Sequence, residues 1–99
     1  MEEYYSQLNN LSQDLLMSAR MGKIDACLFN EFYQLLNELR ATLSGEEFIS
    51  RKIAGLLFFV YVSLAAEAAH CSYTDELFIY VAKIQDILDE IFWDSPFKR

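Results

Sequence analysis

Apolar residues recur three and four positions apart along almost the whole chain, and this spacing is the strongest constraint on its fold. Leu28, Phe32, Leu35 and Leu39 are spaced by four, three and four residues, and the same spacing recurs within residues 4–15 and 77–91. Such spacing places apolar side chains on one face of a helix, whereas a half-buried strand would alternate apolar and polar residues. The sequence therefore predicts an all-α protein.

Glycine, proline and capping residues divide this pattern into four predicted helices, over residues 3–21, 26–43, 46–70 and 74–93. Gly22 suits the left-handed conformation that ends a helix, and Asp25 suits the N-cap of the second helix. Ser44 and Glu47 match a capping box, which predicts that the third helix begins at residue 46. At 99 residues, the chain is predicted to form a single helical domain, residues 1–99, around one core.

The third predicted helix is apolar almost all round. Residues 53–66 carry no charge, but this run is shorter than the roughly 18–20 residues of a membrane span, so a buried core helix is predicted. Gly55 inside this helix suggests a close crossing by a neighbouring helix or a mild bend. The core is also expected to hold four phenylalanines: Phe32, Phe58, Phe59 and Phe78.

Short connections between the helices predict that neighbours run antiparallel. The expected architecture is an antiparallel up-down-up-down four-helix bundle with the hydrophobic third helix as its core, and a less regular helical array is the alternative. If the second and third helices form a hairpin, Cys27 and Cys71 lie about 15 Å apart along its axis, too far for a disulfide. The N-terminal residues lack the pattern of a secretory signal, and the two cysteines are expected to be reduced. Together these features predict a cytoplasmic protein.

The net charge of −7 bears on the kinds of partner. Nucleic-acid binding requires clustered Lys and Arg, and anionic membrane surfaces repel acidic proteins, so neither partner is expected. A basic protein partner is compatible with this charge, because opposite charges speed encounter.

The candidate metal ligands in the sequence are Glu67, His70 and Cys71. Glu67 and His70 share a helical face, but the chain has one histidine, so a monomer cannot repeat the pair as di-iron bundles do. Capping of the helix end by His70 is the favoured interpretation, and no metal or other cofactor is expected. No catalytic motif is recognisable, so the chain is not expected to be an enzyme.

The fourth predicted helix carries the candidate partner-binding surface. Ile79 and Trp93 fall on its charged face, and Tyr33 flanks the polar side of the second helix; exposed Trp and Tyr are typical of interfaces. The full candidate set is Tyr33, Ile79, Lys83, Asp86, Asp89, Glu90 and Trp93. The sequence thus predicts a small interaction module that masks or bridges a partner, as an immunity protein, antitoxin, chaperone or regulatory inhibitor does. A metal-binding or small-molecule-binding bundle and a structural homodimer are the alternatives. The surplus of apolar residues also predicts that the chain self-associates as a homodimer.

Overall fold

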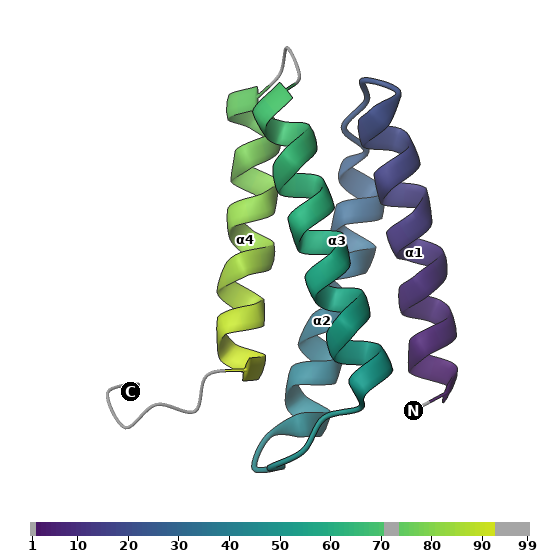
Figure 1. The fold of residues 1–99 in the computed structure, drawn as a ribbon, viewed down its shortest axis with the longest axis vertical. Helices are drawn as coiled ribbons and strands as arrows, with labels where there is room; N and C mark the ends of the chain where they lie inside the picture. The colour runs from purple at the N-terminus through teal and green to yellow at the C-terminus, as the bar shows by residue number, and fades with distance from the viewer. Residues whose placement is uncertain (1, 71–73, 93–99) are drawn as a thin grey trace.

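A computed structural model describes residues 2–70 and 74–92 of the chain. They form four helices and no strand: α1 (Glu2–Arg20), α2 (Ala26–Leu43), α3 (Arg51–His70) and α4 (Thr74–Phe92). The chain reverses direction from each helix to the next (Figure 1). The predicted all-α four-helix bundle is therefore confirmed.

Local capping residues define the turn between α1 and α2. Gly22 has a φ of 79°, and the amide of the following residue, Lys23, donates to the Ser18 carbonyl at 2.9 Å. This arrangement is a Schellman motif, which ends a helix with a left-handed residue. The Asp25 carboxylate then accepts hydrogen bonds from two first-turn amides of α2, at 3.0 and 3.2 Å. Both capping residues were predicted from the sequence, and both are confirmed.

The start of α3 differs from the prediction. The helix begins at Arg51, five residues later than the capping-box motif suggested. Ser44 instead follows the last residue of α2, and Gly45, with a φ of 82°, directs the chain away from the helix axis. The side chain that meets the first turn of α3 belongs to Ser50, whose hydroxyl oxygen accepts from the Ile53 amide at 3.5 Å. The extra residues form a loop that carries the chain across the end of the bundle.

This loop joins two helices that do not pack against each other. In the described part of the chain, the packed pairs are α1/α2, α3/α4, α1/α3 and α2/α4, so α2 and α3 lie on a diagonal. Figure 1 shows α3 in front of α2. The expected α2/α3 hairpin is therefore wrong, and neighbours are antiparallel only within the α1/α2 and α3/α4 hairpins. Cys71, and with it the Cys27–Cys71 distance, lies outside the described residues.

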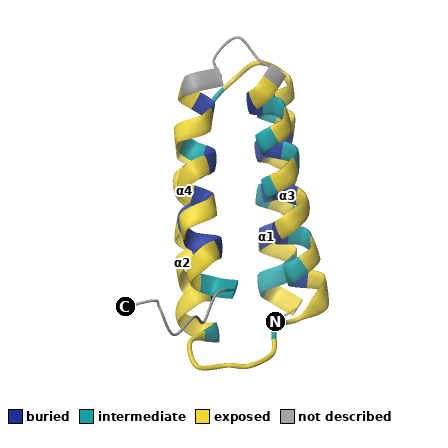
Figure 2. Ribbon diagram, turned by 60° about the vertical axis from the view of Figure 1, so that its left-hand side comes forward, coloured by how far each residue is buried: buried dark blue, intermediate teal, exposed yellow. Residues whose placement is uncertain are grey.

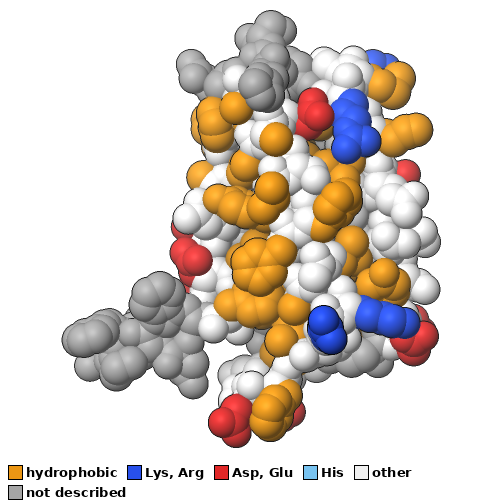
Figure 3. Space-filling view, in the orientation of Figure 1, with side chains coloured by type: hydrophobic (Ala, Val, Ile, Leu, Met, Phe, Trp, Pro, Cys, Tyr) orange, Lys and Arg blue, Asp and Glu red, His pale blue; other side chains and the backbone are white. Residues whose placement is uncertain are grey.

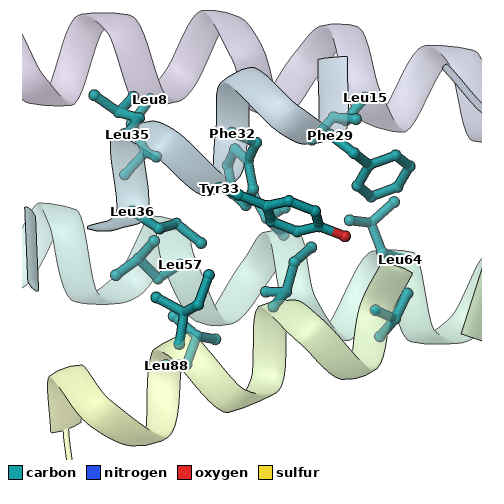
Figure 4. Close-up of a cluster of buried hydrophobic side chains, with 14 of the residues drawn as sticks. Leu8, Leu15, Phe29, Phe32, Tyr33, Leu35, Leu36, Leu57, Leu64 and Leu88 are labelled. Carbon is teal, nitrogen blue, oxygen red and sulfur yellow. The ribbon is translucent and has the colours of Figure 1, made fainter. Parts of the chain in front are cut away.

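The core lies between the α1/α3 and α2/α4 pairs, where the ribbon of the buried residues lies on the inner sides of the helices (Figure 2). All four helices contribute to it (Figure 4). Its fully buried members include Leu8, Leu15, Phe29, Phe32, Leu36, Leu57, Leu64, Leu77 and Ile84. One buried polar side chain accompanies them in the described residues: the Ser12 hydroxyl donates to the Leu8 carbonyl at 2.6 Å, so it is satisfied within α1.

Contrary to expectation, α3 is buried on one side only. Its inner residues, Ile53, Leu57, Val60, Leu64 and Ala68, are at most 1% exposed. By contrast, Phe58 is 53% exposed, Phe59 57% and Val62 60%. Phe78 of α4, also expected in the core, is 43% exposed, whereas Phe32 is buried as predicted. Because each helix packs against two neighbours, it keeps a side that no other helix covers.

By length and composition, α3 over Arg51–Ala69 is also apolar enough to cross a membrane. Only 28% of this apolar stretch is buried within the bundle, through the inner residues that belong to the shared core.

Candidate functional site

The uncovered side of α3 is the most unusual surface of the molecule. We call it the outer face of α3 and define it by six exposed residues: Gly55, Phe58, Phe59, Val62, Ala66 and Ala69. None is charged or polar, although the solvent side of a bundle helix is normally hydrophilic. Figure 3 shows hydrophobic side chains gathered along α3 and its border with α4. Charge appears only towards the two ends of α3, as Arg51 and Lys52 at the start and Glu67 near the end.

Side-chain contacts connect the α4 margin of this face to the bundle. The rings of Phe58 and Phe92 stack with their centroids 5.1 Å apart. One turn further along, the Tyr61 hydroxyl makes a 3.0 Å hydrogen bond with Gln85. Phe78 adds a half-exposed aromatic ring on the α4 side. The apolar surface therefore continues from α3 onto α4.

The α1 margin is polar, with basic groups at one end and an ion pair at the other. At the start of α3, the Lys52 ammonium lies 5.8 Å from the centre of the Tyr5 ring. Near the end of α3, Arg20 of α1 forms a 3.6 Å ion pair with Glu67. The outer face of α3 is thus bordered by basic groups at one end and by a largely neutralised pair at the other.

Sequence reasoning missed this surface because an almost wholly apolar helix was assigned to the interior. A signal was nevertheless present in the spacing. Gly55, Phe59, Val62, Ala66 and Ala69 follow one another by four, three, four and three residues, on the side opposite the inner seam. Two apolar seams on opposite sides of one helix predict two packed partners, and the bundle supplies a partner for only one of them.

The predicted surface on α4 is formed in part. Ile79 is 70% exposed, and Asp86 and Glu90 lie on the same side of the helix, with Asp89 exposed towards α3. Trp93, the expected anchor of this surface, lies outside the described residues. The structure therefore shows an exposed isoleucine on an acidic helix face.

Tyr33 is buried, so its expected exposure on the polar side of α2 was wrong. It is only 6% exposed, and its hydroxyl donates a 2.9 Å hydrogen bond to the Tyr80 carbonyl of α4. Burial, with a smaller electrostatic contribution from Tyr80, raises the pKa of Tyr33 well above its ordinary value. Lys83 covers its ring, with the ammonium 4.7 Å from the ring centre. Figure 4 shows Tyr33 among the buried side chains. Both residues thus hold α2 against α4.

The candidate metal ligands are not brought together in the part of the chain that the structure describes. Glu67 pairs with Arg20, while the side chain of His70 and all of Cys71 lie outside the described residues. No group of three potential ligands occurs among the described side chains, and Cys27 is exposed and free. A shallow polar pocket between α1 and α2 is lined by Glu3, Tyr4, Gln7 and Glu38. It brings together carboxylates without a nucleophile or a basic partner.

Comparison with protein-family models, with curated proteins and with solved structures finds no match to this chain. Its classification therefore rests on the fold alone, which is that of an all-α four-helix bundle protein.

Proposed function

We propose that this chain is a non-enzymatic protein-interaction module of the cytoplasm, which acts by covering the surface of another protein. The observation that carries this proposal is the outer face of α3, an uncharged surface with two half-exposed phenylalanines at its centre. Exposed apolar surfaces of this kind mark interaction sites in soluble proteins.

The energetics of the two phenylalanines support a role in binding. An aromatic side chain has roughly 200 Å² of surface, so a half-exposed ring leaves on the order of 100 Å² in water. Covering that area is worth about 2.5 kcal/mol for each ring, at about 25 cal/mol per Å². The free monomer does not gain this stabilisation, whereas a complex that buries Phe58 and Phe59 does.

The acidic side of α4 offers a second contact surface for the same function. Ile79 would provide an apolar contact there, and Asp86, Asp89 and Glu90 would attract a basic partner. A module with two such surfaces can mask one protein or bridge two. Immunity proteins, antitoxins, chaperones and regulatory inhibitors all work in this way.

The proposal is tested by placing a photo-crosslinking amino acid at position 59 or 79 and irradiating living cells. Position 34, exposed on the outer side of α2, serves as the matched control. We expect protein adducts from position 59, fewer or different adducts from position 79, and none from position 34. The absence of protein adducts from both 59 and 79 would rule out an interaction module.

A further inference from the structure

We propose that the outer face of α3 binds the same face of a second copy of this chain, forming a two-fold dimer in which the two α3 helices run antiparallel. This inference rests on the proposed function and identifies the partner of its main surface. Three properties of the outer face support it: its periodicity, the placement of charge along its α1 margin, and its area.

The periodicity is that of a helix-pairing seam. From Gly55 to Ala69 the outer residues are spaced by four, three, four and three, which is the spacing of a and d positions in a coiled coil. Such a seam is complementary to another helix with the same repeat, because its side chains fit between those of the facing helix. A second α3 carries that repeat. Gly55 also lacks any close neighbour within its own chain, since a Cβ there would have no atom within 4 Å.

The charges on the α1 margin match under one particular two-fold symmetry. Lys52 lies at the start of α3 and Glu67 near its end, and both contact α1 residues, so both lie on the same edge of the helix. Consider a two-fold axis that lies in the interface and runs perpendicular to α3. It makes the two α3 helices antiparallel, and it places the α1 margins of both copies on the same side of the interface. Lys52 of one copy then lies beside Glu67 of the other, a carboxylate that it would share with Arg20. A parallel pair would instead place the two α1 margins on opposite sides of the interface.

The same register aligns the apolar centre of the face. Positions 52 and 67 have their midpoint between residues 59 and 60, so the axis passes beside Phe59. Phe59 of one copy then lies against Phe59 and Val62 of the other. The small residues Gly55 and Ala66, on either side of this centre, allow the two backbones to approach.

The area of the face is adequate for a dimer. Phe58, Phe59 and Phe78 each expose on the order of 100 Å², and Val62 and the small residues bring the apolar centre to about 400 Å² per copy. A standard interface buries about 800 Å² per partner, of which a polar rim is a normal part. Arg20, Arg51 and Lys52 lie along this rim with the carboxylates of Glu67 and, on the α4 side, Asp89, so the rim does not carry the acidic excess of the chain. Two copies can therefore meet here despite a net charge of −7 each.

Light scattering coupled to size exclusion tests the dimer directly. At about 100 μM we expect twice the chain mass of 11.5 kDa, with dissociation on dilution. Phe59→Glu should raise the dissociation constant by about 30-fold or more, because it places a charge at the centre of the interface. Ile79→Glu is the control, since it changes an even more exposed apolar residue outside the face, and it should leave the dimer intact. Circular dichroism confirms that each variant keeps its helices.

A charge exchange tests the antiparallel arrangement. Each single variant, Lys52→Glu or Glu67→Lys, alters two symmetry-related exposed pairs and should weaken the dimer by about 3- to 10-fold. The double variant should recover part of that loss, because Arg20 stays beside position 67 in both. Failure of the double variant to recover would overturn the proposed symmetry.

Three results would overturn the second copy as the partner. The first is a monomer at about 100 μM, and the second is equal weakening by Ile79→Glu and Phe59→Glu. The third is a monomer that binds vesicles of phosphatidylcholine and phosphatidylglycerol through Phe59. Photo-crosslinking at position 59 distinguishes failure of the dimer proposal from failure of the proposed function. A monomer that crosslinks to a different protein refutes self-association and leaves the interaction module standing.

Discussion

Replacing Tyr33 with phenylalanine removes one hydroxyl from the α2/α4 interface and keeps the ring. The lost contact is the 2.9 Å hydrogen bond to the Tyr80 carbonyl, while the Phe29 and Lys83 neighbours of the ring remain. A hydrogen bond of this kind contributes about 1 kcal/mol net to stability. At pH 8 we therefore expect the free energy of unfolding to fall by about 1 kcal/mol in the variant.

The same substitution should have the opposite effect in alkali. Because burial raises the pKa of Tyr33 in the folded protein, the phenol ionises first in the unfolded chain, near its ordinary pKa of 10.0. The unfolded state then binds fewer protons, and the free energy of unfolding falls by about 1.4 kcal/mol per pH unit above pH 10. The stabilisation from Tyr33 is thus fully present below pH 10 and lost above it. Phenylalanine has no proton to lose, so at pH 11 the variant should equal or exceed the natural protein in stability.

Urea unfolding followed by circular dichroism at pH 8 and pH 11 measures both effects. The quantity compared is the difference in unfolding free energy between the two proteins, because other titrating groups contribute equally to both. A difference that is the same at the two pH values would show that the folded protein does not protect the Tyr33 phenol. The reasoning from its burial would then be refuted.

Three further substitutions test the local structure. Asp25→Ala removes the carboxylate that caps α2 and should lower the free energy of unfolding by about 1 kcal/mol, measured as a reduced urea midpoint; an unchanged midpoint would contradict the capping role. Gly55→Ala should raise the unfolding free energy by about 0.5–1 kcal/mol in dilute protein, because the added Cβ meets no atom; thermal melts would show a loss instead if the site were crowded. Ser12→Ala should change it by less than about 1 kcal/mol, because the hydroxyl bonds only within its own helix; a larger loss in chemical unfolding would indicate a tertiary role.

The sequence predicted the features that depend on neighbouring residues. The helical repeat identified all four helices, and the capping residues Gly22 and Asp25 were recognised because their partners lie within a few positions. The start of α3 was missed for the opposite reason. Ser44 and Glu47 have the composition of a capping box, but Gly45 between them turns the chain away from the helical direction.

The errors at Tyr33 and on α3 share one cause, which is that the residue pattern of a helix does not show which of its sides a neighbouring helix covers. Tyr33 was assigned to the solvent because it flanks the polar side of α2, but α4 packs there and covers the tyrosine. Phe58 and Phe59 were assigned to the core because α3 was expected to be surrounded. Apolar periodicity shows which sides of a helix favour burial. Only the packing of the helices shows which of those sides are buried.

The diagonal connection between α2 and α3 also determines how the bundle assembles from the unfolded chain. The α1/α2 and α3/α4 hairpins each form from residues close in sequence, which is the fast kind of folding event. Each hairpin alone leaves its share of the core in water, since both hairpins contribute buried residues and Phe29 and Tyr33 of the first contact Tyr80 of the second. Stability therefore arises when the two hairpins dock, and both docking interfaces join helices that run parallel. The bundle is best understood as two helical hairpins that dock within one chain, linked by the loop of residues 44–50.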